Sequence, residues 1–99
     1  MESRKHKQIA NKIAKIKGSD YHSDKGVDVR TASQAIEIEV DPAAFGHAKQ
    51  QLAGSTRTPY LAVPKSLVKK ALEATSGTRF GVMDENAKVI KRGIKLKSK

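Results

Sequence analysis

VDVRTASQAIEIEV, residues 27–40, predicts two short β-strands joined by a tight turn. Branched apolar residues alternate with other residues on both sides of the segment 31–34. Since successive side chains of a strand point to opposite faces, one face of this hairpin is expected to be apolar. That face comprises Val27, Val29, Ile36, Ile38 and Val40. The other face then carries three carboxylates, those of Asp28, Glu37 and Glu39.

The length of the turn determines how the three carboxylates meet. In an antiparallel pair of strands, the residue numbers of any two partners add up to the same value. When this value is odd, Asp28 lies on the same face as both glutamates. A two-residue turn at residues 32 and 33 sets Asp28 opposite Glu37, whereas a four-residue loop sets it opposite Glu39. Both registers keep the three acids together.

Grouped carboxylates repel one another, and the repulsion raises at least one pKa unless a cation joins them. Oxygen ligands at this density suit Mg²⁺ or Mn²⁺ better than zinc. The hairpin therefore predicts a metal site. The alternative is a solvated polar face on an edge hairpin, with Lys25, Arg30 and Lys49 close enough to soften the repulsion.

Helical and strand patterns follow on both sides of the hairpin. Ile9, Ile13 and Ile16 give residues 2–17 an apolar stripe at helical spacing. The alternation of strands and helices predicts an α/β fold, with a small mixed sheet flanked by helices in a single domain, 1–99. The expected elements are a helix at 2–17, the hairpin at 27–40, a helix at 41–54 that begins at Asp41-Pro42, a strand at 60–63, a helix at 64–77, a hairpin of strands 79–83 and 88–90, and a basic tail at about 91–99.

The composition favours an anionic partner. The 99 residues carry a formal net charge of +10, and nucleic acid is the commonest partner of a small basic domain. A lysine-rich surface that serves solubility alone is the alternative. The chain has no cysteine, which excludes disulfides and thiolate metal sites. No apolar run approaches the roughly 18 residues of a membrane span, so we expect a cytoplasmic protein that makes no membrane contact.

Basic and aromatic side chains distributed along the chain are the candidates for contacts with nucleic acid. Lysines on the first helix would contact phosphates, and Tyr21 could stack on a base. The three histidines, His6, His22 and His47, have no metal-ligand spacing and are expected on the surface. The candidate nucleic-acid-binding residues are Lys5, Lys12, Lys15, Tyr21, Lys25, Arg30, Gln50 and Arg57.

The chain resembles the PD-(D/E)XK nuclease superfamily, in particular small members similar to archaeal Holliday junction resolvases. The resemblance rests on GVDV at residues 26–29, AIEIEV at residues 35–40 and a following helix that contains Gln50. The order helix, hairpin, helix, strand, helix over about residues 5–85 also matches. This resemblance implies a restriction endonuclease-like core of order α-β-β-α-β-α-β-β.

The resemblance also implies a function. Asp28 and Glu37 would be metal ligands together with the main-chain carbonyl of Ile38, the metal would be Mg²⁺ or Mn²⁺, and the substrate would be DNA. The chain is then expected to be a metal-dependent DNA endonuclease, acting on structured or branched DNA. Because 99 residues cover little DNA, we expect a homodimer that presents two sites.

Two departures from the family pattern leave alternatives open. The lysine expected two residues after Glu37 is Glu39 here, which would bind the metal or take the proton from water. Lys49 could instead supply the cation from the following helix. The usual strand before the Asp28 strand is not predicted, and Glu2 could stand for the glutamate that relatives carry on the first helix. These departures motivate a second reading, a non-catalytic nucleic-acid-binding module, and charge alone allows a third, a ribosome-associated RNA-binding protein.

Overall fold

A computed structural model describes residues 4–21 and 27–95 of the chain. Its elements follow the expected order, with two short 3₁₀ turns, Pro42–Ala44 and Lys65–Leu67, before the second and third helices. The elements are α1 (Arg4–Lys17), β1 (Val29–Arg30), β2 (Gln34–Ile38), α2 (Phe45–Ala53), β3 (Thr58–Val63), α3 (Val68–Thr75), β4 (Gly81–Asp84) and β5 (Val89–Lys91).

The strands form one five-stranded mixed sheet in the order β1-β2-β3-β4-β5. The two outer pairs, β1 with β2 and β4 with β5, are antiparallel hairpins. The two inner pairs are parallel, because α2 and α3 each carry the chain back to the start of the sheet before the next strand. The predicted mixed α/β sheet is confirmed at this level.

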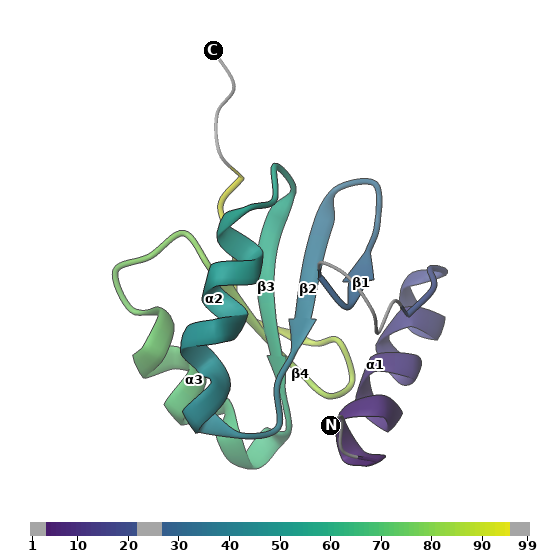
Figure 1. Ribbon diagram of the computed structural model, residues 1–99, viewed down its shortest axis with the longest axis horizontal. Helices are drawn as coiled ribbons and strands as arrows, with labels where there is room; N and C mark the ends of the chain where they lie inside the picture. Colours follow the sequence, from purple (N-terminus) through teal and green to yellow (C-terminus); the bar gives the residue numbers. More distant parts are fainter. Residues whose placement is uncertain (1–3, 22–26, 96–99) are drawn as a thin grey trace.

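Helices cover both faces of the sheet (Figure 1). On one face α1 packs against residues that include Ile36, Tyr60 and Met83. On the other face α2 and α3 pack against the alternate strand residues, such as Leu61 and Val82. Parallel crossovers of the same hand place their helices on the same face, which explains why α2 and α3 lie together.

Two apolar residues differ from their expected places. Ile16 was expected in the apolar stripe of α1, but its side chain is 53% exposed. Val27 was expected beside Val29, yet it packs with Ala35 and Leu52 in a separate cluster. The alternation of faces is interrupted because β1 begins only at Val29.

A residue before β1 also pairs with the hairpin, outside the named strands. Tyr21 forms an isolated antiparallel bridge with Val29.

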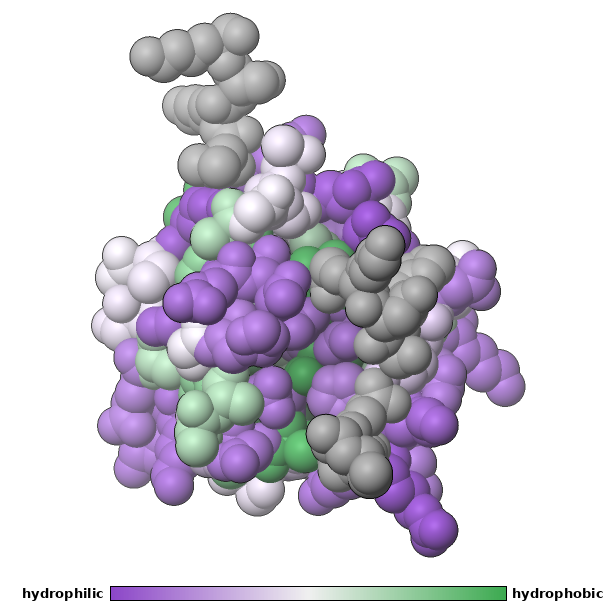
Figure 2. Space-filling view, in the orientation of Figure 1, coloured by the Kyte–Doolittle hydropathy of each residue, from purple (hydrophilic) through white to green (hydrophobic). Residues whose placement is uncertain are grey.

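Within residues 4–21 and 27–95, none of the helices has the length and apolar character that crossing a bilayer requires. Hydrophilic side chains dominate the face shown in Figure 2, and hydrophobic residues are seen mainly between the elements.

A close backbone contact attaches the residues after β5 to the sheet. The amide of Ile94 donates to the carbonyl of Arg79 at 2.8 Å, beside Gly81 and Gly93. A Cβ atom on Gly81 would lie 2.4 Å from the nitrogen of Gly93 and 2.7 Å from the carbonyl oxygen of Lys91. Both obstacles are backbone atoms, so they cannot rotate away.

We therefore expect Gly81→Ala to lower the free energy of unfolding by about 1–3 kcal/mol, the usual cost of overpacking. Urea denaturation measures the difference. Gly46→Ala is the matched control, because Gly46 lies in α2 and a Cβ there would meet nothing within 4 Å. That variant should gain roughly 0.5–1 kcal/mol from the lower backbone entropy of alanine. Equal effects of the two substitutions would contradict the contact.

Candidate functional site

The first hairpin has the register that a two-residue turn dictates. Val29 pairs with Ile36 and Arg30 with Ala35, and the amide of Thr31 donates to the carbonyl of Gln34 at 2.9 Å. The Thr31 hydroxyl oxygen closes the turn by accepting from the amides that follow it, those of residues 33 and 34. These pairs have the residue-number sum of the two-residue turn, so the first of the two predicted registers is confirmed, and Asp28 and Glu37 directly adjoin the last pair.

Beyond the last backbone pair of the hairpin, hydrogen bonds from the side chains of Asp28 and Glu37 join the two segments. The amide of Asp28 donates to Glu37 Oε1 at 3.1 Å, and the amide of Ile38 donates to Asp28 Oδ2 at 2.9 Å. Both acids are buried, with 8% and 7% of their surfaces exposed. Each carboxylate therefore uses one oxygen to hold the backbone of the opposite strand.

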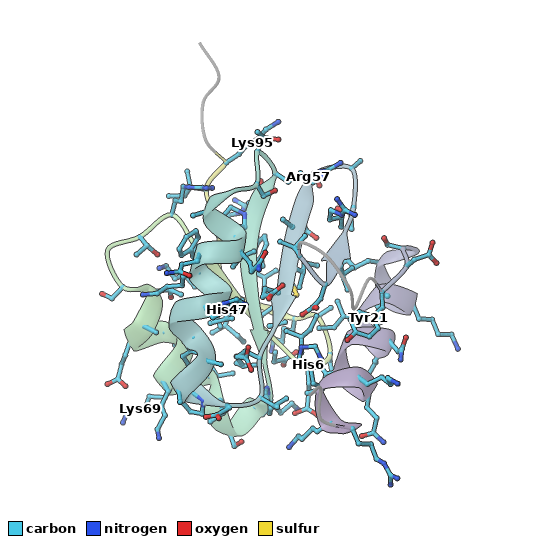
Figure 3. All side chains as sticks on the ribbon, in the orientation of Figure 1. His6, Tyr21, His47, Arg57, Lys69 and Lys95 are labelled. Carbon is cyan, nitrogen blue, oxygen red and sulfur yellow. The ribbon has the colours of Figure 1, made fainter. Side chains whose placement is uncertain are left out.

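Helix α1 adds a histidine to this pair. His6 Nε2 lies 3.2 Å from Asp28 Oδ2, and the Tyr21 hydroxyl lies 3.4 Å from His6 Nδ1. The two aromatic rings are tilted against each other with centroids 6.1 Å apart, as Figure 3 shows beside α1. These contacts, from Tyr21 to His6 and from His6 to Asp28, join α1 to the hairpin.

The structure corrects the prediction that His6 is an ordinary surface residue. Only 14% of its side chain is exposed. A signal was present in the sequence, since His6 precedes Ile9, Ala10 and Ile13 by three, four and seven residues and so lies on the buried face of the helix. Tyr21, a candidate for stacking on a nucleic-acid base, is half-buried and packs against the core cluster that includes residues of α1.

Burial and mutual repulsion act on the acids as expected for grouped carboxylates. Burial, and then the negative charge of Asp28, raise the pKa of Glu37 to about 8. Burial also raises the pKa of Glu39, against the opposing effects of the Val40 amide and His6. Without a cation, Glu37 therefore keeps a proton at neutral pH, and a cation that displaced this proton would remove the repulsion.

The described residues provide a two-carboxylate site rather than a full metal cage. No group of three or more His, Asp or Glu side chains within residues 4–21 and 27–95 is arranged to hold a metal ion. One oxygen of each acid, Asp28 Oδ1 and Glu37 Oε2, makes no hydrogen bond to the rest of this part of the chain. Mg²⁺ commonly takes one or two carboxylates and fills its shell with water and substrate phosphates, so the pair fits this ion.

Two further candidates are engaged elsewhere. Glu39 Oε1 accepts from the amide of Val40 at 3.2 Å. Lys49 Nζ donates to the carbonyl of Ala74 at 3.1 Å, which holds this ammonium at the contact between α2 and α3. The structure therefore does not bring the Lys49 side chain into contact with the carboxylates.

The candidate contacts with nucleic acid are mostly exposed. Lys12 is held by a hydrogen bond to Asn86 Oδ1, and Arg57 Nε donates to the Thr31 carbonyl at 2.8 Å. Lys25 lies outside the described residues, as do Glu2 and His22. The exposed candidates are Lys5, Lys12, Lys15, Arg30 and Gln50, and His47 is also exposed, on α2.

The fold and the site together define a class: a small basic α/β domain with a buried carboxylate pair on the first hairpin of a five-stranded mixed sheet. The chain matches no protein-family model, no curated protein and no solved structure.

Proposed function

We propose that the protein is a metal-dependent endonuclease that hydrolyses the phosphodiester bonds of DNA, with a restriction endonuclease-like core. One observation carries the proposal: Asp28 and Glu37 stand opposite each other, buried, and each keeps one oxygen free of hydrogen bonds to the described residues. A protein seldom keeps two acids in such a place without a use for them. The resemblance to PD-(D/E)XK nucleases in the same residues supports the choice of reaction.

In this proposal Asp28 Oδ1 and Glu37 Oε2 hold Mg²⁺ or Mn²⁺, and the resemblance adds the carbonyl of Ile38. The bound ion would polarise the scissile phosphate and lower the pKa of a bound water. His6 contacts Asp28 Oδ2, so it orients this carboxylate and leaves the other oxygen for the metal. Glu39 is the candidate to accept the proton of the attacking water, because its raised pKa brings it closer to neutral pH.

The charge of the chain supports DNA as the substrate. The net charge of +10 includes exposed lysines on α1, which would hold phosphates without reading the base sequence. A symmetric homodimer would present two such sites to a structured or branched DNA.

We expect purified protein to cleave plasmid or branched DNA in Mg²⁺ or Mn²⁺, and Asp28→Ala to lose at least about 100-fold of this activity, because it removes a metal ligand. Gel analysis of the products measures the loss. Asp41→Ala is the control, since the Asp41 side chain accepts the amide of Ala43 at the start of the turn before α2 and touches neither acid of the pair among the described residues. It should cleave like the wild type. Equal cleavage by Asp28→Ala and wild type would contradict the proposal.

A non-catalytic nucleic-acid-binding module is the second candidate. The observation that favours it is the engagement of Lys49 with Ala74, because the residue that could have replaced the missing family lysine is held at α3. DNA binding that Asp28→Ala retains, without cleavage of any substrate by the wild type, would support this reading. A preference for structured RNA over DNA in competition would instead favour an RNA-binding protein.

A further inference from the structure

A pocket of about 350 Å³ lies between the first hairpin and the loop that follows α2. Arg30 enters it from β1, and Arg57 enters it from the loop. Ser55, Thr56 and Gln51 contribute hydroxyl and amide groups, and Val27 contributes an apolar wall. Among the lining residues that the structure describes, none is a carboxylate. The described lining therefore gathers two positive charges and several hydrogen-bond donors.

The loop residues are held in place by their own hydrogen bonds. Arg57 Nε donates to the Thr31 carbonyl at 2.8 Å, which ties the guanidinium to the hairpin turn. The amide of Arg57 donates to the hydroxyl oxygen of Ser55 at 3.1 Å, so the hydroxyl can still donate its hydrogen to a ligand. Neither Arg30 nor Arg57 forms an ion pair with a carboxylate of residues 4–21 and 27–95. The Arg57 guanidinium is thus held in place, and neither guanidinium is paired with a carboxylate of these described residues.

The helix dipole of α2 disfavours the binding of an anion in this pocket. The pocket includes Gly54, at the C-terminal end of α2, where the helix dipole amounts to about half a negative charge. Two guanidinium groups outweigh it. Guanidinium also matches phosphate through paired N–H donors, an advantage that the helix end does not remove.

We infer that this pocket binds one phosphate group of the DNA backbone, next to the carboxylate pair. The choice of DNA rests on the proposed function. Val27 directly precedes Asp28, and Arg30 follows it by two residues on the same hairpin, so a strand held in the pocket passes beside the acids. The pocket then sets the position of the backbone, and the acids act on a neighbouring phosphodiester.

The test is DNA binding by fluorescence anisotropy, with a labelled duplex in Ca²⁺ at several salt concentrations. Arg57→Gln and Arg30→Gln should each weaken binding about 10-fold and lower the slope of log K against log salt by about 1. Lys69→Gln is the control of equal charge, since Lys69 is exposed on α3 and lies at the other end of the molecule from Arg57 (Figure 3). It should change the affinity less than about 2-fold.

Several outcomes would overturn the inference. If both arginine variants bind DNA with the same affinity as Lys69→Gln, the affinity depends on the net charge alone and not on the pocket. A second such outcome combines two measurements. Inorganic phosphate would stabilise the wild type but not Arg57→Gln, while Arg57→Gln would bind DNA as tightly as the wild type. That result would assign the pocket to free phosphate. Arg30 is exposed, so its variant keeps the test valid if Arg57→Gln unfolds.

The same assay separates this inference from the proposed function. A protein that binds DNA through both arginines and cleaves no DNA contradicts the nuclease and leaves the pocket intact. A protein whose cleavage and binding survive both arginine substitutions contradicts the pocket alone.

Discussion

Glu37→Gln is expected to make the metal-free protein more stable at pH 8 while abolishing cleavage. Burial and the charge of Asp28 raise the pKa of Glu37 from 4.5 to about 8 in the folded state. Between these values the folded protein keeps a proton that the unfolded chain releases, so the stability of the wild type falls as the pH rises. The loss is complete once the pH passes the folded pKa. Glutamine is neutral throughout and still accepts the amide of Asp28 through its side-chain oxygen.

The gain at pH 8 should be of the order of 4 kcal/mol, and it should vanish below about pH 3.5, where the wild type is protonated in both states. Urea denaturation in EDTA across this range measures it. Glu73→Gln is the control, because Glu73 is exposed on α3. It should change the stability by less than about 0.5 kcal/mol at either pH.

Metal addition completes this test. Mg²⁺ or Mn²⁺ should raise the melting temperature of the wild type at pH 8, because a ligand that binds only the folded state stabilises it, and should not raise that of Glu37→Gln. Cleavage by the variant should fall at least about 100-fold. A pH slope of stability that persists in Glu37→Gln would contradict the electrostatic account. Equal stabilisation of both proteins by metal would contradict the carboxylate site.

Ile13→Ala is expected to cost about 2–5 kcal/mol of unfolding free energy, the range for a large-to-small change in a core. Ile13 is fully buried between α1 and the sheet. Ile16→Ala makes the same chemical change one turn later in the same helix, but 53% of Ile16 is exposed. Its effect should stay within about 0.5 kcal/mol, since alanine also favours the helix slightly.

Urea denaturation compares the two variants directly, and their shared change in helix propensity cancels. If Ile13→Ala does not fold, Ile13→Val should still lose about 0.5–1.5 kcal/mol. Similar losses from Ile13→Ala and Ile16→Ala would mean that α1 packs through the full stripe expected from the sequence, rather than through the face seen here.

Much of the candidate site could be predicted because it depends on short-range rules. The period of two groups Asp28 with the two glutamates for either turn length, and the structure then shows the register of the two-residue turn. Hydrogen bonds from the amides of Asp28 and Ile38 to the acids were not predictable, since they arise only where the backbone pairing of β1 ends. These bonds determine which carboxylate oxygens stay free.

Long-range contacts account for what the sequence did not reveal. His6 contacts Asp28 because α1 crosses the face of the hairpin, a packing angle that no local pattern specifies. Lys49 turns to Ala74 because α2 and α3 lie side by side on the other face. Arg30 and Arg57 share a pocket because the parallel pairing of β2 with β3 brings the loop after α2 beside the hairpin turn.

The sequence by itself determined the order of the elements, the mixed sheet and the grouping of Asp28 with the two glutamates, while the structure selected one of the two possible hairpin registers. The order, the sheet and the grouping follow from side-chain periodicity and connection length, which act within one segment or between neighbours. Only the tertiary structure decided which face of α1 is buried, that His6 meets the acids, and that two arginines meet in one pocket. Those outcomes depend on how segments far apart in the chain pack, and packing is a property of the whole core.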